Sequence, residues 1–118
     1  MNIEEFSTYC VSKKGVSESF PFGVDILVFK VCAKMFALCA IDGVPCKVNL
    51  KCDPDWSSEL REEHIDILPG IHMNKTHWNT VNLEGSLDNK LILKLIDHSY
   101  DLVVKSLSKK DQNVILNS

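Results

Sequence analysis

Three β-type segments follow one another so closely between residues 25 and 52 that they leave little choice of topology. The segments "DILVFKV" (25–31), "KMFALCAI" (34–41) and "PCKVNLKC" (45–52) are rich in β-branched, aromatic and other apolar residues. Only "CA" separates the first two, and a short turn around Asp42 and Gly43 separates the last two. Links this short join antiparallel neighbours, so the sequence predicts a three-strand antiparallel meander.

The third segment alternates between apolar and polar residues. Cys46, Val48, Leu50 and Cys52 share one side of a strand, because successive side chains point to opposite faces. Lys47, Asn49 and Lys51 share the other side. We therefore expect the first group to face the core, and the second group to face solvent or a partner.

Four helices are expected, each with a good capping residue or start signal. The start signals are Asn2 for a helix over 2–13, Asp53 with Pro54 for a helix from 54, Asp88 for a long helix over 89–106, and Ser108 with Asp111 for a terminal helix. Residues at helical spacing support them: Ile3, Phe6 and Cys10 share one face of the first helix, and Leu91, Leu95, Ser99 and Leu102 line one face of the third.

The remaining segments predict connectors and one further strand. "KKGVSESFPFG" (13–23) is interpreted as a connector, and Pro69-Gly70 as a turn. "NTVNL" (79–83) predicts a strand. The predicted fold is a single α+β domain over 1–118, with an antiparallel sheet of the meander plus one or two further strands, and helices packed on one face.

Charge and composition narrow the class of function. Nothing approaches the length of a transmembrane helix, and the acidic start "MNIEEFSTYC" does not resemble a secretory signal, so we expect a cytoplasmic protein without a membrane role. The net charge of −3 argues against strong non-specific binding to phosphates, but leaves room for a local basic patch. Arg61 is the only arginine, so base-specific reading of guanine has few candidates.

No motif predicts catalysis, a metal or a cofactor. The number of cysteines is odd and none forms a C-x-x-C pair, so we interpret them mainly as packing residues in a reducing compartment. Spacings among His64, His72, His77 and His98 match no zinc pattern. A nucleophilic Cys52 would need a base within reach, and strand alternation turns this residue toward the core. We therefore expect a protein that is not an enzyme.

The polar stretch "HMNKTHWNTV" (72–81) allows two interpretations. Asn74, Thr76 and Asn79 are typical turn and cap residues; Asn74 would cap a single helical turn. In that structural interpretation Trp78 and Val81 anchor the corner in the core, and the outward strand positions are Thr80 and Asn82. In the other, Lys75 and His77 join the sheet lysines to bind an anionic or nucleotide-like partner.

Four longer stretches, "FPFGVDILVFKVCAKMFAL", "LKCDPDWSSELREEH", "ILPGIHMNKTHWNTVNLEGSL" and "LIDHSYDLVVKSL", together resemble the MmcQ/YjbR family. The resemblance covers roughly residues 3–107. It implies an α+β fold with an antiparallel sheet flanked by helices, likened to secretion chaperones and frataxin-like proteins. It also implies DNA binding, the label that members commonly carry, but no catalytic residues. Relatives often have glycine at the turn where this chain has Cys32-Ala33.

We therefore expect a small, non-enzymatic binding protein with DNA as its partner. The alternative is a protein-interaction or secretion-chaperone-like module that binds a protein partner, with an exposed apolar patch; in either case the chain would be a monomer or a homodimer. An enzyme would instead need a deep pocket around His72 and His77. The candidate contact residues are Lys47, Asn49, Lys51, Lys75, His77, Trp78 and Thr80.

Overall fold

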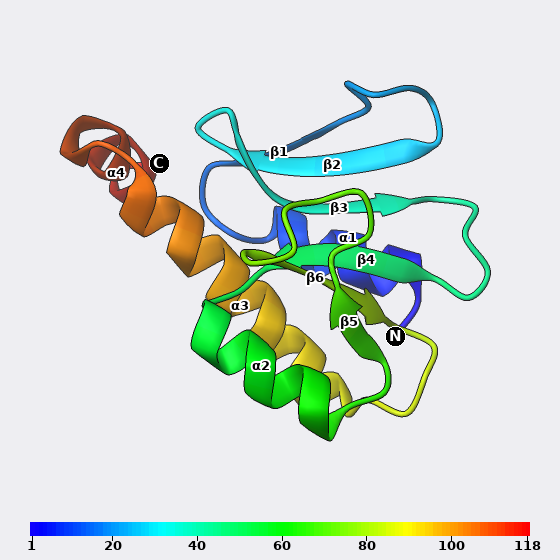
Figure 1. Cartoon of the computed structure of the whole chain (residues 1–118). Coiled ribbons are helices and arrows are strands. Elements are labelled where there is room, and N and C mark those ends of the chain that lie inside the picture. The colour runs from blue at the N-terminus through cyan, green and yellow to red at the C-terminus, as the bar shows by residue number, and fades with distance from the viewer.

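The computed structural model describes all 118 residues and shows one six-stranded antiparallel sheet with four helices (Figure 1). The strand order is β1-β2-β3-β4-β6-β5. The helices are α1 (Ile3–Val11), α2 (Pro54–Glu63), α3 (Asn89–Ser106) and α4 (Lys109–Leu116). The strands are β1 (Val16–Ser19), β2 (Ile26–Val31), β3 (Lys34–Ala40), β4 (Lys47–Lys51), β5 (Ile67–Pro69) and β6 (Trp78–Asn82). No helix has both the length and the apolar character needed to cross a membrane.

The meander and the helix starts are confirmed. Strands β2, β3 and β4 pair as antiparallel neighbours in chain order. Each predicted cap accepts a backbone N–H in the first turn of its helix; the caps are Asn2, Asp53, Asp88 and Ser108. Asn2 and Glu5 form a complete capping box, whereas only the serine half of the box at Ser108 is formed.

Two segments predicted as connectors contain strands. β1 lies inside 13–23 and pairs with β2, while β5 includes Pro69 of the predicted turn and pairs with β6. Both are edge strands, so each needs backbone hydrogen bonds on one side only. Proline is tolerated at such an edge because its missing N–H breaks no interior ladder.

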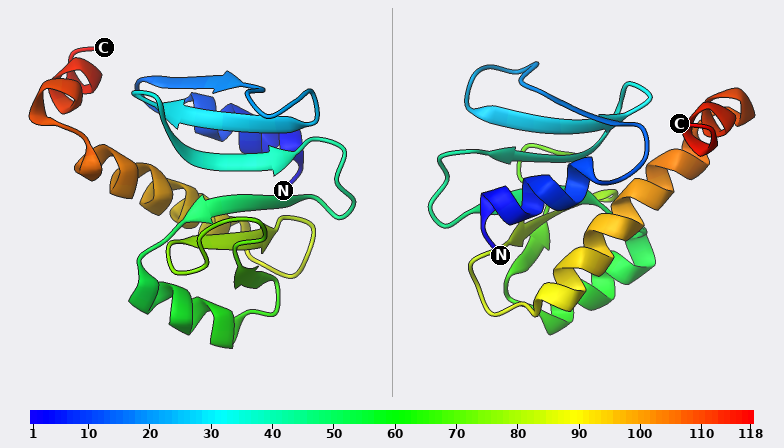
Figure 2. Two further views of the ribbon diagram at one scale, coloured as in Figure 1. Left: turned by 45° about the horizontal axis from the view of Figure 1, so that its top comes forward. Right: turned by 180° about the vertical axis from the view of Figure 1, so that it is seen from behind.

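The main core lies between one face of the sheet and the helices. α1 and α3 cross that face, as the view from behind shows (Figure 2). Helix α2 packs beside β5, and its Leu60 joins the same core. The predicted inward residues of the third segment are all buried in this core, namely Cys46, Val48, Leu50 and Cys52.

The opposite face of the sheet carries no helix, and we call it the open face. Register places on it Ile26, Val28, Lys30, Met35, Leu38, Ala40, Lys47, Asn49, Lys51, Leu68, Trp78, Thr80 and Asn82. Only the segment between β5 and β6 (70–77) crosses in front of it (Figure 1). A second, small core forms there from Val28, Leu38 and Trp78, with Met73 of that segment packed against it.

The β2–β3 hairpin turns on two residues that are in the left-handed region without being glycine. Cys32 has φ 47° and Ala33 has φ 66°. The left-handed conformation costs a residue with a Cβ roughly 1–2 kcal/mol, which explains why glycine is preferred in two-residue hairpins. We expect Ala33→Gly to raise the free energy of unfolding by about 1 kcal/mol, measured by urea denaturation. Ala40→Gly, at the end of β3 where no positive φ is needed, serves as the control and is expected to destabilise.

Candidate nucleic-acid interface

Four lysines belong to the open face or to the segment that crosses it, and none has an ion-pair partner. Register puts Lys47 opposite Asn82 and Lys51 opposite Trp78, and Lys30 lies opposite Met35. The 70–77 segment, which crosses this face, contributes Lys75. The structure contains salt bridges only at Lys13 and His64, so none of these four ammonium groups is neutralised by a carboxylate. One carboxylate, that of Asp66, lines a small cavity together with Lys47 and accepts the Asn82 side-chain amide. Lysines therefore outnumber carboxylates on this face despite the acidic chain.

Acidic residues are almost absent from the strands. Glu18 is the only one, and it lies opposite Phe29, whose side chain is in the helix-side core. Most of the other carboxylates belong to the helices or their caps; examples are Glu4 and Glu5 in α1, Asp55, Glu59, Glu62 and Glu63 in α2, and Asp97 and Asp101 in α3. The two sides of the molecule thus differ in charge, which the net value conceals.

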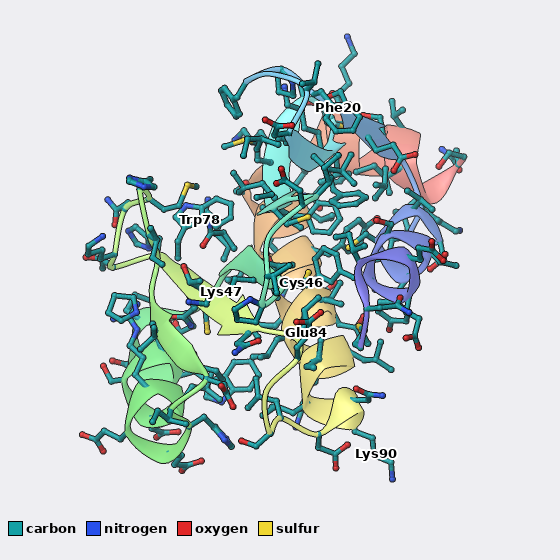
Figure 3. All side chains as sticks on the ribbon, turned by 90° about the vertical axis from the view of Figure 1, so that its right-hand side faces the viewer. Phe20, Cys46, Lys47, Trp78, Glu84 and Lys90 are labelled. Carbon is teal, nitrogen blue, oxygen red and sulfur yellow. The ribbon has the colours of Figure 1, made fainter.

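Trp78 corrects one sequence prediction. It was expected to share the core with Val81, but residues three apart on a strand point to opposite faces. Val81 is in the main core, while Trp78 is 7% exposed in the small core of the open face. Lys51 Nζ lies 5.9 Å from the Trp78 ring centroid. Figure 3 shows Trp78 and Lys47 on the same side of the sheet. The covered ring stabilises the face and offers no surface for base stacking.

Thr80 and Asn49 form a directed hydrogen-bond chain. Thr80 lies on the open face, as expected, but it is buried rather than exposed. Its Oγ1 accepts the Ile71 N–H at 2.9 Å and donates to Asn49 Oδ1 at 2.6 Å. The 70–77 segment covers the hydroxyl, and strand alternation, which predicted an exposed Thr80, carries no information about such a covering loop. Asn49 itself remains half-buried.

The stretch 72–81 is built largely from structural contacts. The Asn74 side-chain Oδ1 accepts the Thr76 N–H, and the Asn74 backbone carbonyl accepts the N–H groups of His77 and Trp78. These bonds confirm Asn74 as the predicted cap, and the single turn does not continue as a helix. Lys75 Nζ donates to the Gly70 carbonyl at 2.8 Å. Its ammonium group therefore supports the loop as well as contributing charge.

Arg61 holds this stretch in place, a role that no sequence pattern revealed. Its Nε donates to Asn79 Oδ1 at 2.8 Å, and its guanidinium also donates to the carbonyls of Lys75 and Trp78. Asn79 in turn donates to Ser57 Oγ, so the α2 helix is tied to β6. The only signal in the sequence was that Arg61 is the single arginine. Because the guanidinium is engaged, it is not free to contact guanine.

The histidines do not converge. His72 and His77 are exposed, and no three His, Cys, Asp or Glu side chains are close enough to hold a metal ion. His98 Nε2 accepts the Asp53 N–H at 3.0 Å, and its ring packs edge-on to Trp56. Burial lowers the pKa of His98, which favours the neutral ring that this hydrogen bond requires.

The cysteines behave as packing residues. All five are free, and Cys10, Cys39, Cys46 and Cys52 are buried. Burial raises the pKa of the Cys52 thiol, although a hydrogen bond with Ser57 acts in the opposite sense. Burial also raises the pKa of Cys39 to about 12. The nucleophilic interpretation of Cys52 therefore gains no support, because a protonated, buried thiol is a poor nucleophile.

Two small cavities adjoin the lysines. One, of about 210 Å³, lies on the open face beneath the 70–77 segment, and Lys47, Asn49, His72 and Thr80 are among its lining residues. The other, of about 170 Å³, is lined in part by Lys51, Asp53 and His77. The structure thus brings most of the predicted candidates to one surface, with His77 at its margin.

Comparison with known proteins agrees with this fold. A model of the YjbR family matches residues 11–102. "Uncharacterized protein YjbR" of Escherichia coli K12 is 34% identical over 98% of both chains. The crystal structure of protein DR2400 of Deinococcus radiodurans, described as a DUF419 domain, is 37% identical with a TM-score of 0.90, covering 97% of this chain and 87% of its own. A Pseudomonas syringae crystal structure is 33% identical with a TM-score of 0.76, covering 86% and 98%.

Proposed function

This chain belongs to the YjbR family, and on that premise we propose that it is a non-enzymatic cytoplasmic protein whose open face binds nucleic acid. The observation that carries the proposal is the separation of charge between the two sides of the sheet. Lys30, Lys47, Lys51 and Lys75 lie without carboxylate partners on the open face. Three of these lysines lie on the sheet, and Lys75 lies on the segment that crosses it, where its Nζ donates to the Gly70 carbonyl. Ammonium groups without carboxylate partners favour a polyanion, since each phosphate contact releases condensed counterions.

Binding of this kind is expected to be weakly dependent on sequence. Lysine contacts a phosphate as a point charge, whereas base reading relies mainly on arginine, asparagine and glutamine at base edges. Arg61 is engaged by Asn79 and two backbone carbonyls. The lysines would therefore position the strand, and the dependence on salt would be their measurable signature.

The test compares two triple variants that remove equal charge from opposite sides. Binding to fluorescein-labelled single-stranded and duplex DNA is followed by fluorescence anisotropy at about 50 and 200 mM salt. The open-face variant is Lys30→Ala/Lys47→Ala/Lys51→Ala, and the matched control on α3 is Lys90→Ala/Lys94→Ala/Lys105→Ala. Three lost phosphate contacts are expected to weaken binding at least about tenfold at low salt. They are also expected to flatten the slope of log K against log salt by about 2 for single strands and by about 3 for duplex.

The control variant should bind as the unmodified protein does. Equal weakening by both variants would mean that only overall charge matters, and would remove the open face as the binding surface. Absence of saturable binding at low salt would contradict nucleic-acid binding itself.

A second candidate function rests on exposed apolar side chains at one end of the sheet. The β1–β2 and β3–β4 loops both lie at that end (Figure 1), and the Ile41 N–H of one donates to the Asp25 carbonyl of the other. Phe22, Val24 and Val44 are 63%, 81% and 92% exposed. Exposed apolar patches favour protein partners. If the anisotropy titration shows no binding, we propose this patch as the site of a protein-interaction module.

A further inference from the structure

The cavity beneath the 70–77 segment combines apolar walls with polar groups in fixed positions. Its volume of about 210 Å³ is far above the roughly 10–15 Å³ that a cavity needs in order to hold one water. Ile26, Leu38 and Ala40 supply apolar surface from β2 and β3, while Asn49 and Thr80 supply polar atoms from β4 and β6. A small planar group fits this description better than a chain of phosphates does.

The orientation of the Asn49 amide is set by the protein. The Thr80 hydroxyl has a single proton, and its oxygen already accepts the Ile71 N–H. The hydroxyl donates this proton to Asn49 Oδ1, at 2.6 Å. This assigns the oxygen of the amide to Thr80 and leaves Asn49 Nδ2, which has no partner in the protein, available to a ligand. The site thus offers a preoriented hydrogen-bond donor.

The rim of the cavity adds a charge and a strained residue. Lys47, which lines the cavity, is exposed and has no ion-pair partner. His72 lines the cavity from the 70–77 segment with φ 61°. A residue with a side chain pays for that conformation, and such residues concentrate at binding sites. An imidazole at the lip can pack against a ring that enters.

We infer that this cavity receives one unstacked nucleobase of a single strand, with Asn49 Nδ2 donating to a ring carbonyl and Lys47 meeting the adjacent phosphate. The inference rests on the proposed nucleic-acid function and names the form of the ligand. A base inside a duplex is stacked and paired, so it cannot enter a cavity, whereas single strands expose theirs. Thymine and uracil present carbonyl acceptors that suit a donor whose own oxygen is occupied.

The experiment separates reading of the base from binding of the backbone. Anisotropy is measured with oligo-dT of about 12 nucleotides and with an oligomer of the same length and charge whose sites are all abasic. The unmodified protein is expected to bind oligo-dT at least about fivefold more tightly than the abasic strand, the scale of one buried base. Asn49→Ala is expected to remove that difference and to leave the affinity for the abasic strand unchanged.

Two further measurements guard against a folding defect in Asn49→Ala. His72→Gly keeps a residue that accepts positive φ and removes only the imidazole, so it should lower the preference for oligo-dT in a folded protein. In ¹⁵N–¹H spectra of the unmodified protein, the Asn49 side-chain amide signals should move on titration with thymidine monophosphate.

Each failure has a separate meaning. Equal affinity for both strands, or a preference for oligo-dT that Asn49→Ala and His72→Gly leave unchanged, would overturn the cavity assignment and leave the lysine face as a backbone-binding surface. Binding of neither strand at low salt, with no movement of the Asn49 amide signals, would overturn both proposals.

Discussion

Replacing Ser99 with alanine is expected to lower the free energy of unfolding by about 2–4 kcal/mol, because two buried backbone groups lose their partner. Ser99 lies in α3 and is fully buried. Its Oγ donates to the Phe36 carbonyl in β3 and accepts the Lys51 N–H of β4 at 2.8 Å. One hydroxyl therefore joins α3 to β3 and β4, and it supplies the hydrogen bonds of the Phe36 carbonyl and the Lys51 N–H.

The location of Phe36 explains why a serine is needed there. The β2–β3 register shifts after Phe29, so that Phe29 pairs with Ala37 and Lys30 with Met35, and Phe36 is left without a partner. A bulge of this kind leaves a carbonyl outside the ladder. An apolar residue at position 99 would continue the helix stripe but leave that carbonyl unsatisfied.

Urea denaturation of Ser99→Ala, read against Ser106→Ala on the same helix, gives the measurement. Ser106 Oγ donates only to the Val103 carbonyl of its own helix, so its loss is expected to cost less than about 0.5 kcal/mol. A loss below about 1 kcal/mol for Ser99→Ala, within the net value of a single ordinary hydrogen bond, would show that water or a backbone shift replaces the hydroxyl.

Local signals in the sequence were sufficient for most of the fold. The four helix caps and the alternation of β4 act within a few residues, so they can be recognised without the tertiary structure. β1 and β5 could not be recognised in this way. "VSES" is polar and "ILP" is short and contains proline, so both become strands only because a neighbouring strand offers its edge.

The candidate site was predicted only in part, because local patterns identify the face of a strand but not the contacts that a distant loop makes with it. Alternation identified Lys47, Asn49 and Lys51 as one face, and the same rule applied to Ile26, Val28 and Lys30 would have added Lys30. The burial of Thr80 depends on Ile71, which reaches it across a loop. No pattern of spacing contains such a contact, and the charge separation also appears only when register assigns each residue to a side.

Arg61→Ala is expected to lower the free energy of unfolding by about 2–3 kcal/mol and to loosen the 70–77 segment, because Asn79 Oδ1 becomes buried without a donor. Two backbone carbonyls that share the guanidinium lose their donor at the same time. Arg61→Lys is expected to recover little of this loss. An ammonium group cannot reproduce the planar fork that contacts a side chain and two carbonyls together.

The two Arg61 variants separate geometry from charge. Both are compared with Lys94→Ala, an exposed residue of α3 outside this network, by urea denaturation and by hydrogen exchange of the 70–78 amides. Faster exchange in that segment in both Arg61 variants, with Lys94→Ala unchanged, would identify Arg61 as the residue that holds the loop over the open face. Full recovery by Arg61→Lys would instead assign the effect to positive charge beside the acidic α2. In that case the loop that covers Thr80 and completes the base-sized cavity would be held by its own contacts, chiefly those of Asn74 and Lys75.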